Sequence, residues 1–127
     1  MSEAGRLRIL YVDDDKDIRH IVKLSLTLDP LVEVRLAADP TRVLEELTGE
    51  WHPDVVMLDV MMPKIDGLTL MSALRQRPDF QFTPFIFVTA RAREADVQRY
   101  HTAGAAGVIL KPFDPLTLVS RVRALIE

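Results

Sequence analysis

The stretch LRILYVDDDKDI, residues 7–18, joins an apolar run to a cluster of carboxylates and then to an amphipathic segment. Its first half, LRILYV (7–12), predicts a buried strand, and Asp15 is placed to cap the helix that follows. Asp13 and Asp14 are then left at the end of the strand. Two carboxylates ~4 Å apart repel by about 4 kcal/mol at an effective dielectric constant near 20, so we expect a positive partner beside them.

Four further apolar runs resemble the first and alternate with helix-length amphipathic segments. Most are too uniformly apolar for a half-exposed antiparallel sheet, so they predict parallel strands buried on both faces. The predicted strands are LRILYV (7–12), VEVRLA (32–37), DVVMLD (54–59), PFIFVT (84–89) and GVILK (107–111). The predicted helices cover residues 16–28, 40–48, 67–77 and 94–103, and a last helix follows from residue 115. This alternation predicts a three-layer α/β sandwich of five βα units, with two common strand orders left open.

Local signals mark where several elements begin and end. Asp-Pro pairs at residues 39–40 and 114–115 predict helix starts, because Asp caps free N–H groups and Pro suits the first helical position. Gly49 and Gly104 are predicted to end helices. The alternating phenylalanines of residues 80–87 predict packing around the fourth strand.

Composition narrows the class of protein. A chain of 127 residues that is 48% hydrophobic fits one globular domain. Its formal net charge of -3 and its scattered Lys and Arg argue against nucleic acid as the main partner. The chain has no Cys, which fits a reducing compartment, and no apolar run long enough for a signal peptide or a membrane span. We therefore expect a soluble, cytoplasmic protein that does not bind membranes.

Polar side chains follow four of the predicted strands. Ligands of open parallel sheets bind at the carboxyl ends of the strands, so these side chains should converge on one rim. They are Asp13, Asp14, Asp59, Thr89 and Lys111. Three carboxylates suit a hard divalent cation such as Mg²⁺, which leaves coordination positions open for phosphate oxygens.

Phosphoryl transfer onto the protein itself is the chemistry that such a rim supports. Asp59 beside Mg²⁺ can act as a nucleophile toward phosphorus, and Lys111 can stabilise charge on the phosphoryl oxygens while Thr89 donates a hydroxyl. Taken singly, each of these three is a common strand-end residue. Their joint placement is what predicts a site.

At these residues the sequence resembles the receiver domain of bacterial two-component response regulators, of the chemotaxis-Y type. The matching motifs are ILYVDDD (9–15), PDVVMLDVMMPKIDG (53–67), FVTA (87–90) and AGAAGVILKPF (103–113). The resemblance implies one receiver domain over residues 1–127, with a flavodoxin-like (βα)5 fold and a five-stranded parallel sheet in the order 2-1-3-4-5. It further implies that the protein is a signalling switch and not an enzyme. Such a switch catalyses only its own phosphorylation and dephosphorylation.

The resemblance also implies roles for single residues. Asp59 accepts the phosphoryl group from a sensor histidine kinase or a histidine phosphotransfer protein, and the result changes the surface offered to an unknown downstream target or output domain. Asp14, Asp59 and the backbone carbonyl of Met61 bind Mg²⁺ directly, whereas Asp13 acts mostly through water.

The remaining implied roles concern the phosphoryl group. Thr89 and Lys111 are expected to contact it. The Lys111–Pro112 peptide bond is expected to be cis, which aims the lysine into the site.

One position departs from the family pattern, and two others lie where the family itself varies. Val108 replaces the aromatic residue that usually turns inward when the Thr moves toward phosphate. Arg91 and Met61 lie where the family varies its rate of dephosphorylation.

Two rival functions remain open. A Mg²⁺-dependent phosphohydrolase of the haloacid dehalogenase class also uses a strand-end Asp, but it needs a second Asp where this chain has Met61. A receiver-like module that binds partners without phosphorylation is the other rival, and the intact Asp and Lys residues weigh against it.

Overall fold

The computed structural model describes residues 5–47, 50–90 and 93–127, and it contains the predicted parallel sheet. The sheet order is β2-β1-β3-β4-β5, so the predicted α/β class is confirmed and the flavodoxin-like order is the one adopted. The strands are β1 (Leu7–Val12), β2 (Val32–Ala37), β3 (Val55–Asp59), β4 (Phe85–Thr89) and β5 (Gly107–Leu110). All four strand pairings are parallel, which places the carboxyl ends of the strands on one rim.

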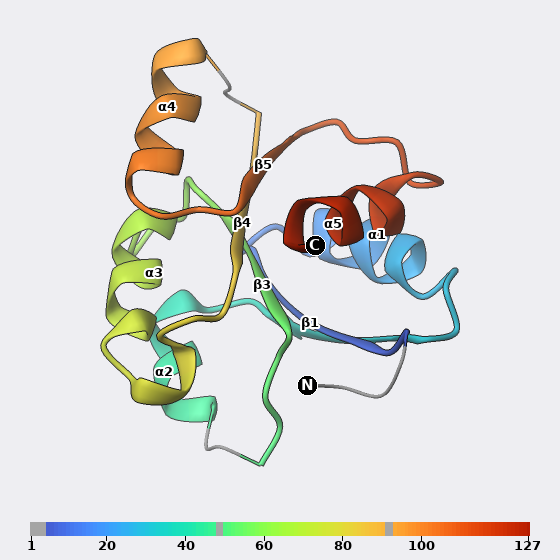
Figure 1. Cartoon of the computed structure of the whole chain (residues 1–127), viewed down its shortest axis with the longest axis horizontal. Coiled ribbons are helices and arrows are strands. Elements are labelled where there is room, and N and C mark those ends of the chain that lie inside the picture. Colours follow the sequence, from blue (N-terminus) through green and yellow to red (C-terminus); the bar gives the residue numbers. More distant parts are fainter. Residues whose placement is uncertain (1–4, 48–49, 91–92) are drawn as a thin grey trace.

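Helices cover both faces of this sheet and give the molecule three layers. In Figure 1, α2, α3 and α4 lie on one side of the strands and α1 and α5 on the other. The helices are α1 (Lys16–Leu26), α2 (Pro40–Glu46), α3 (Gly67–Arg75), α4 (Glu94–Thr102) and α5 (Leu118–Ile126), and a short 3-10 helix, η1, covers Pro78–Phe80. None of the helices in the described ranges has the length and hydropathy that crossing a bilayer requires.

The strand side chains divide into two apolar clusters, one on each face of the sheet. In β1, Ile9 and Tyr11 belong to the cluster under α1 and α5, whereas Leu10 and Val12 belong to the cluster under α2, α3 and α4. Every residue of β3 and β4 is buried, and the only polar residues in these two strands are their last ones, Asp59 and Thr89. Burial of one Leu, Ile or Val side chain contributes about 1.5–3 kcal/mol, so the two clusters hold the rim residues on a rigid frame.

Helix caps confirm several of the local predictions. The Asp15 carboxylate caps α1, and the Asp39 carboxylate caps α2 by accepting a hydrogen bond from the Thr41 backbone N–H. Gly104 follows α4 with a φ of 108°, a left-handed conformation that favours glycine and ends the helix. The predicted stop at Gly49 lies outside the described residues.

Two sequence predictions on this scaffold are wrong. The last helix begins at Leu118 instead of residue 115, because the Asp114 carboxylate accepts a hydrogen bond from the Leu116 N–H and forms a turn before the helix. Phe82 does not pack around the fourth strand. It is 89% exposed, because the turn after η1 directs it outward. Elsewhere the predicted ends of strands and helices either match the observed ones or differ from them by one or two residues.

Candidate functional site

Three of the predicted site residues extend strand rows that face α1 and α5. Side chains two residues apart on a strand point to the same face, so Asp13, Asp59 and Lys111 continue rows from the apolar cluster below them. The preceding members of these rows are Tyr11, Met57 and Ile109. The rows come from β1, β3 and β5, and they bring the two carboxylates and the ammonium group together at the rim.

Lys111 is the positive partner that the carboxylates require. Its Nζ lies 3.0 Å from Oδ2 of Asp13 and 3.3 Å from Oδ2 of Asp59. Burial alone would lower the pKa of Lys111, but the hydrogen bond and charge of Asp13, with a further contribution from Asp59, raise it. The ammonium group therefore stays charged at neutral pH. The Lys111–Pro112 peptide bond that follows β5 is cis, as the resemblance implies.

Asp59 is held at the end of β3 with both carboxylate oxygens occupied. Oδ1 accepts a hydrogen bond of 3.1 Å from the Met61 backbone N–H, and Oδ2 accepts the bond from Lys111. Burial and the charge of Asp13 raise the pKa of Asp59 above its ordinary value of 3.8, against the opposing effect of Lys111. Its surroundings in the folded protein therefore disfavour the charged form of the Asp59 carboxylate relative to water.

Asp13 is completely buried and has three hydrogen-bond donors around its carboxylate. Oδ2 accepts from the Tyr11 hydroxyl at 2.7 Å and from Lys111, and Oδ1 accepts from the Asp15 backbone N–H at 2.9 Å. The Arg19 guanidinium donates to the Asp13 backbone carbonyl at 2.9 Å. Sequence reasoning missed both Tyr11 and Arg19. Tyr11 could have been found from its spacing, because residues two apart on a strand point to the same face and Tyr11 precedes Asp13 by two.

The carboxylates of Asp13, Asp14 and Asp59 form a group that fits a divalent cation. Each offers one oxygen, and these three oxygens lie within 4.8 Å of one another. Asp14 is exposed, whereas the other two are buried, so the group opens to solvent on one side. An all-oxygen, carboxylate-rich set open to water is the environment that Mg²⁺ favours.

Thr89 ends β4 directly beside Lys111. Its side chain is buried, and its backbone carbonyl accepts a hydrogen bond of 2.8 Å from the Lys111 N–H. In the sheet Asp59 pairs with Val88, so Thr89 lies one residue beyond the phosphoacceptor candidate. The structure therefore brings together the polar residues that the sequence predicts at four strand ends.

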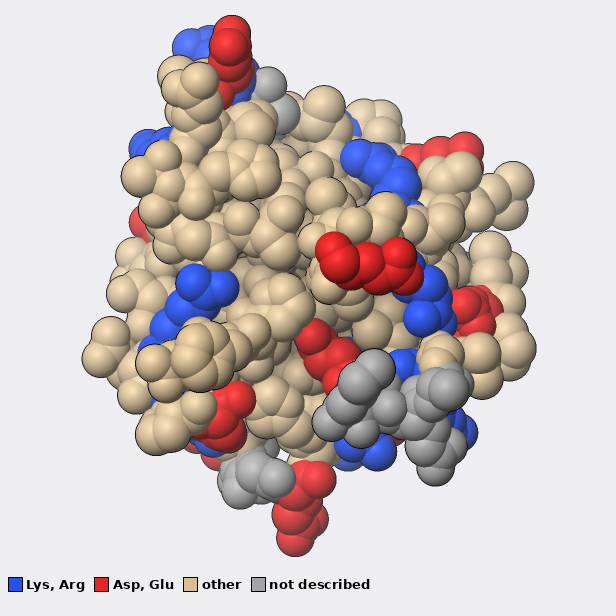
Figure 2. Space-filling model, in the orientation of Figure 1, with Lys and Arg blue, Asp and Glu red and all other residues tan. Residues whose placement is uncertain are grey.

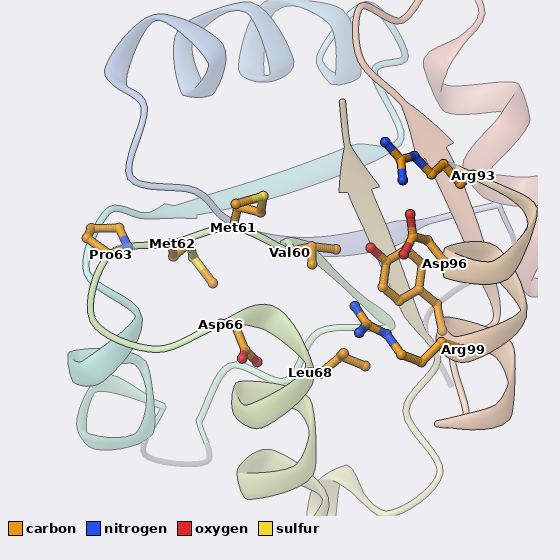
Figure 3. A pocket seen from close by; sticks show the side chains of 10 residues that line it. Val60, Met61, Met62, Pro63, Asp66, Leu68, Arg93, Asp96 and Arg99 are labelled. Carbon is orange, nitrogen blue, oxygen red and sulfur yellow. The ribbon is translucent and has the colours of Figure 1, made fainter. Parts of the chain in front are cut away.

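A cavity of about 640 Å³ lies next to this rim, between α4 and the loop after β3. Figure 3 shows Arg93 and Asp96 of the α4 start on one side, and Met61, Met62 and Pro63 of the loop on the other. Sequence reasoning missed this cavity because its walls come from segments about 30 residues apart, counted from Pro63 to Arg93. Arg91, singled out in the sequence, lies outside the described residues.

Charged side chains are interspersed on the face of the molecule seen in Figure 2. Among the described residues of that face, basic and acidic side chains lie singly or in mixed groups, and the basic ones form no continuous patch.

Comparison with known proteins identifies the family. Residues 9–123 match the family described as the response regulator receiver domain. The chain is 37% identical over 124 residues to the transcriptional regulatory protein CseB of Streptomyces coelicolor, which covers 98% of this chain and 51% of CseB. It is 34% identical to the DNA-binding dual master transcriptional regulator RpaA of Synechocystis, over 94% of this chain and 49% of RpaA. The chain thus spans about half the length of these relatives.

Solved structures agree with this assignment. The chemotaxis response regulator CheY4 of Vibrio cholerae superimposes with a TM-score of 0.84 at 31% identity, covering 95% of this chain and 99% of CheY4. The beryllofluoride-activated receiver domain of DrrB gives a TM-score of 0.78 at 30% identity, over 95% of this chain and 97% of that domain. The chain belongs to the response regulator receiver domains, the phosphorylation-dependent switches of two-component signalling.

Proposed function

We propose that Asp59 is the phosphoacceptor of this receiver domain and that residues 1–127 form one such domain. The observation that carries the proposal is the position of the Asp59 carboxylate, which lies 3.3 Å from Lys111 Nζ and within 4.8 Å of oxygens of Asp13 and Asp14. Of the carboxylates in the described part of the chain, Asp59 alone lies at the end of β3, where it contacts Lys111 and lies close to Asp13 and Asp14. It therefore combines a nucleophilic oxygen with groups that can neutralise an incoming phosphoryl group.

The reaction transfers a phosphoryl group from a phosphohistidine. An Asp59 carboxylate oxygen attacks phosphorus, the P–N bond breaks, and its electron pair stays on the histidine nitrogen while an acyl phosphate forms. Lys111 stays paired with buried Asp13 and can turn its remaining N–H donors toward the phosphoryl oxygens. The Thr89 hydroxyl, at the end of the adjacent strand, donates to the same group.

The proposal assigns Mg²⁺ to the acidic group. Asp14, Asp59 and the backbone carbonyl of Met61 would hold the ion directly, and Asp13 would act mostly through water. The ion, when bound, would supply positive charge that offsets the negative charge of the phosphoryl group. The three Asp13 hydrogen bonds support the indirect role, because they leave that carboxylate little capacity for a further partner.

The proposed partners follow from the same chemistry. A sensor histidine kinase or a histidine phosphotransfer protein supplies the phosphoryl group, and a downstream target or output domain reads the changed surface. We also propose the cytoplasmic location that the sequence predicts. Membership of the receiver family favours a switch over a phosphohydrolase. We therefore assign to the domain only its own phosphorylation and the slow hydrolysis of the resulting acyl phosphate.

Labelling with a small phosphodonor tests the assignment. The metal-saturated domain is incubated with acetyl phosphate, and its intact mass is measured together with that of Asp59→Asn. We expect a single added phosphoryl group on the wild-type chain, none on Asp59→Asn and normal labelling of the control Asp79→Asn, whose carboxylate lies in a surface pair with Arg77. Equal labelling of wild type and Asp59→Asn would contradict the proposal.

A further inference from the structure

The Tyr11 hydroxyl is a buried polar group that the phosphoryl-transfer proposal does not use. Tyr11 is completely buried in β1, beneath the acidic group, and its hydroxyl donates to Oδ2 of Asp13 at 2.7 Å. Burial and this hydrogen bond raise the pKa of Tyr11 well above its ordinary value, so it remains a neutral donor. Oδ2 of Asp13 therefore always has the Tyr11 hydroxyl as one of its hydrogen-bond donors.

The hydrogen bonds around Asp13 divide unequally between its two oxygens. A carboxylate offers about four lone-pair sites, about two on each oxygen. Oδ2 accepts from Tyr11 and from Lys111, which fills it, whereas Oδ1 accepts from the Asp15 N–H alone. Only Oδ1 keeps a vacant acceptor site. In this arrangement Asp13 can serve a cation, directly or through water, with one oxygen and not with both.

We infer that Tyr11 is a specificity-determining residue that restricts Asp13 to one available oxygen and so biases the acidic group toward Mg²⁺ and against Ca²⁺. The inference rests on the metal site of the proposed function. Ca²⁺ takes six to eight oxygen ligands and accepts bidentate carboxylates, whereas Mg²⁺ requires a small octahedral shell that it largely fills with water. A carboxylate held to one oxygen denies Ca²⁺ a ligand that Mg²⁺ does not need.

Removal of the hydroxyl should reverse this restriction. In Tyr11→Phe the ring keeps its packing, Oδ2 keeps its bond from Lys111, and each oxygen of Asp13 then has one vacant acceptor site. The carboxylate becomes able to bind through both oxygens. Ca²⁺ should gain affinity relative to Mg²⁺ even if the two absolute affinities both change.

The test is a pair of NMR titrations with MgCl2 and CaCl2 at constant ionic strength, for wild type, Tyr11→Phe and the control Tyr100→Phe. Tyr100 is the only other tyrosine and is also buried, but it packs against Phe87 on the opposite face of the sheet. We expect the Kd ratio of Ca²⁺ to Mg²⁺ to fall by at least about threefold in Tyr11→Phe and to stay within that limit in Tyr100→Phe. A smaller fall in Tyr11→Phe overturns the inference, whatever happens to the absolute affinities.

A second measurement needs no variant of Tyr11. The ¹³Cζ resonance of a tyrosine reports its hydroxyl hydrogen bond, and Tyr100→Phe leaves Tyr11 as the only source of this signal. We expect saturation with Mg²⁺ to leave the Tyr11 resonance unchanged, because the cation does not compete for Oδ2. Loss of the hydrogen bond on Mg²⁺ addition would overturn the inference. A wild-type domain that binds neither cation would overturn the proposed metal site and this inference with it.

Discussion

Neutralising Asp59 should make the metal-free domain more stable, and the structure gives the size of the effect. The change is Asp59→Asn, which keeps the side-chain shape and the acceptor for the Met61 N–H. The repulsion from buried Asp13 is at least about 3.5 kcal/mol for oxygens within 4.8 Å at an effective dielectric constant near 20. Exposed Asp14 contributes about 1 kcal/mol at the dielectric constant of water.

The attraction to Lys111 opposes this repulsion. At 3.3 Å it amounts to about 5 kcal/mol on the same scale, so the Coulomb terms cancel to within about 1 kcal/mol. The loss of solvation on burial then decides whether neutralising Asp59 raises or lowers the free energy of unfolding. Burial disfavours the charged form, so neutralisation should raise it. We expect Asp59→Asn to gain about 1–2 kcal/mol at pH 7, which corresponds to a rise of roughly 3–8 °C in Tm for a domain of this size.

The pH dependence checks the cause of this gain. Asp59 has a raised pKa in the folded state, so the stability linked to its protonation is fully present below its ordinary value of 3.8 and is lost as pH rises through the folded pKa. The advantage of Asp59→Asn should therefore be present at pH 7 and absent near about pH 3.5.

The assay is thermal unfolding followed by circular dichroism in EDTA, with Asp79→Asn as the control. That variant removes an exposed carboxylate paired with Arg77 and should leave Tm unchanged or slightly lower. A lower Tm for Asp59→Asn at pH 7 would refute the reasoning, because it would show that the attraction of Lys111 outweighs repulsion and burial together.

Further perturbations test the metal group, the loop after β3 and the output. Asp14→Ala should abolish Mg²⁺ binding in a titration while leaving the metal-free Tm equal or higher, since one like charge is removed; unchanged Mg²⁺ affinity would show that the site is misplaced. Gly67→Ala should destabilise the domain by about 1–3 kcal/mol in urea unfolding, because the new Cβ would lie 2.7 Å from the Asp59 backbone oxygen; wild-type stability would show that the loop yields freely. Beryllofluoride with Mg²⁺ should cause large NMR shifts at residues 93–97 and modest ones at Val108; the reverse pattern would contradict this expectation.

The strand ends were predictable from the sequence because periodicity and topology fix them. A uniformly apolar run followed by a polar residue places Asp59 and Lys111 on one rim in any parallel sheet, whatever the side-chain rotamers. The strand order, which the family resemblance supplied, places β4 between β3 and β5, so the contact also depends on the length of the Lys111 side chain. The 3.3 Å contact confirms that the predicted positive partner lies beside the carboxylates.

Other features depend on interactions that a linear pattern does not encode. Tyr11 belongs to an apolar strand and is equally compatible with simple packing, so its hydrogen bond to Asp13 emerges only from the rotamers of both side chains. The Asp-Pro pair at residues 114–115 begins a turn as readily as a helix, and the turn displaced the start of α5 to Leu118.

The side chains around Val108 explain why the switch signal should leave through α4. Val108 pairs with Phe87 in the sheet, and the ring of Tyr100 on α4 contacts the Phe87 ring edge-on at a centroid distance of 5.2 Å. The two rings of this contact thus come from β4 and α4, and the β5 position holds a short β-branched residue with a stiff χ1. Thr89 lies two residues after Phe87 on the same strand. We therefore expect a shift of Thr89 toward Asp59 to move the end of β4 and to reach α4 through the Phe87–Tyr100 contact. Val108 has no ring to swing into the space that Thr89 would leave, so we expect α4 to be the element whose position reports phosphorylation.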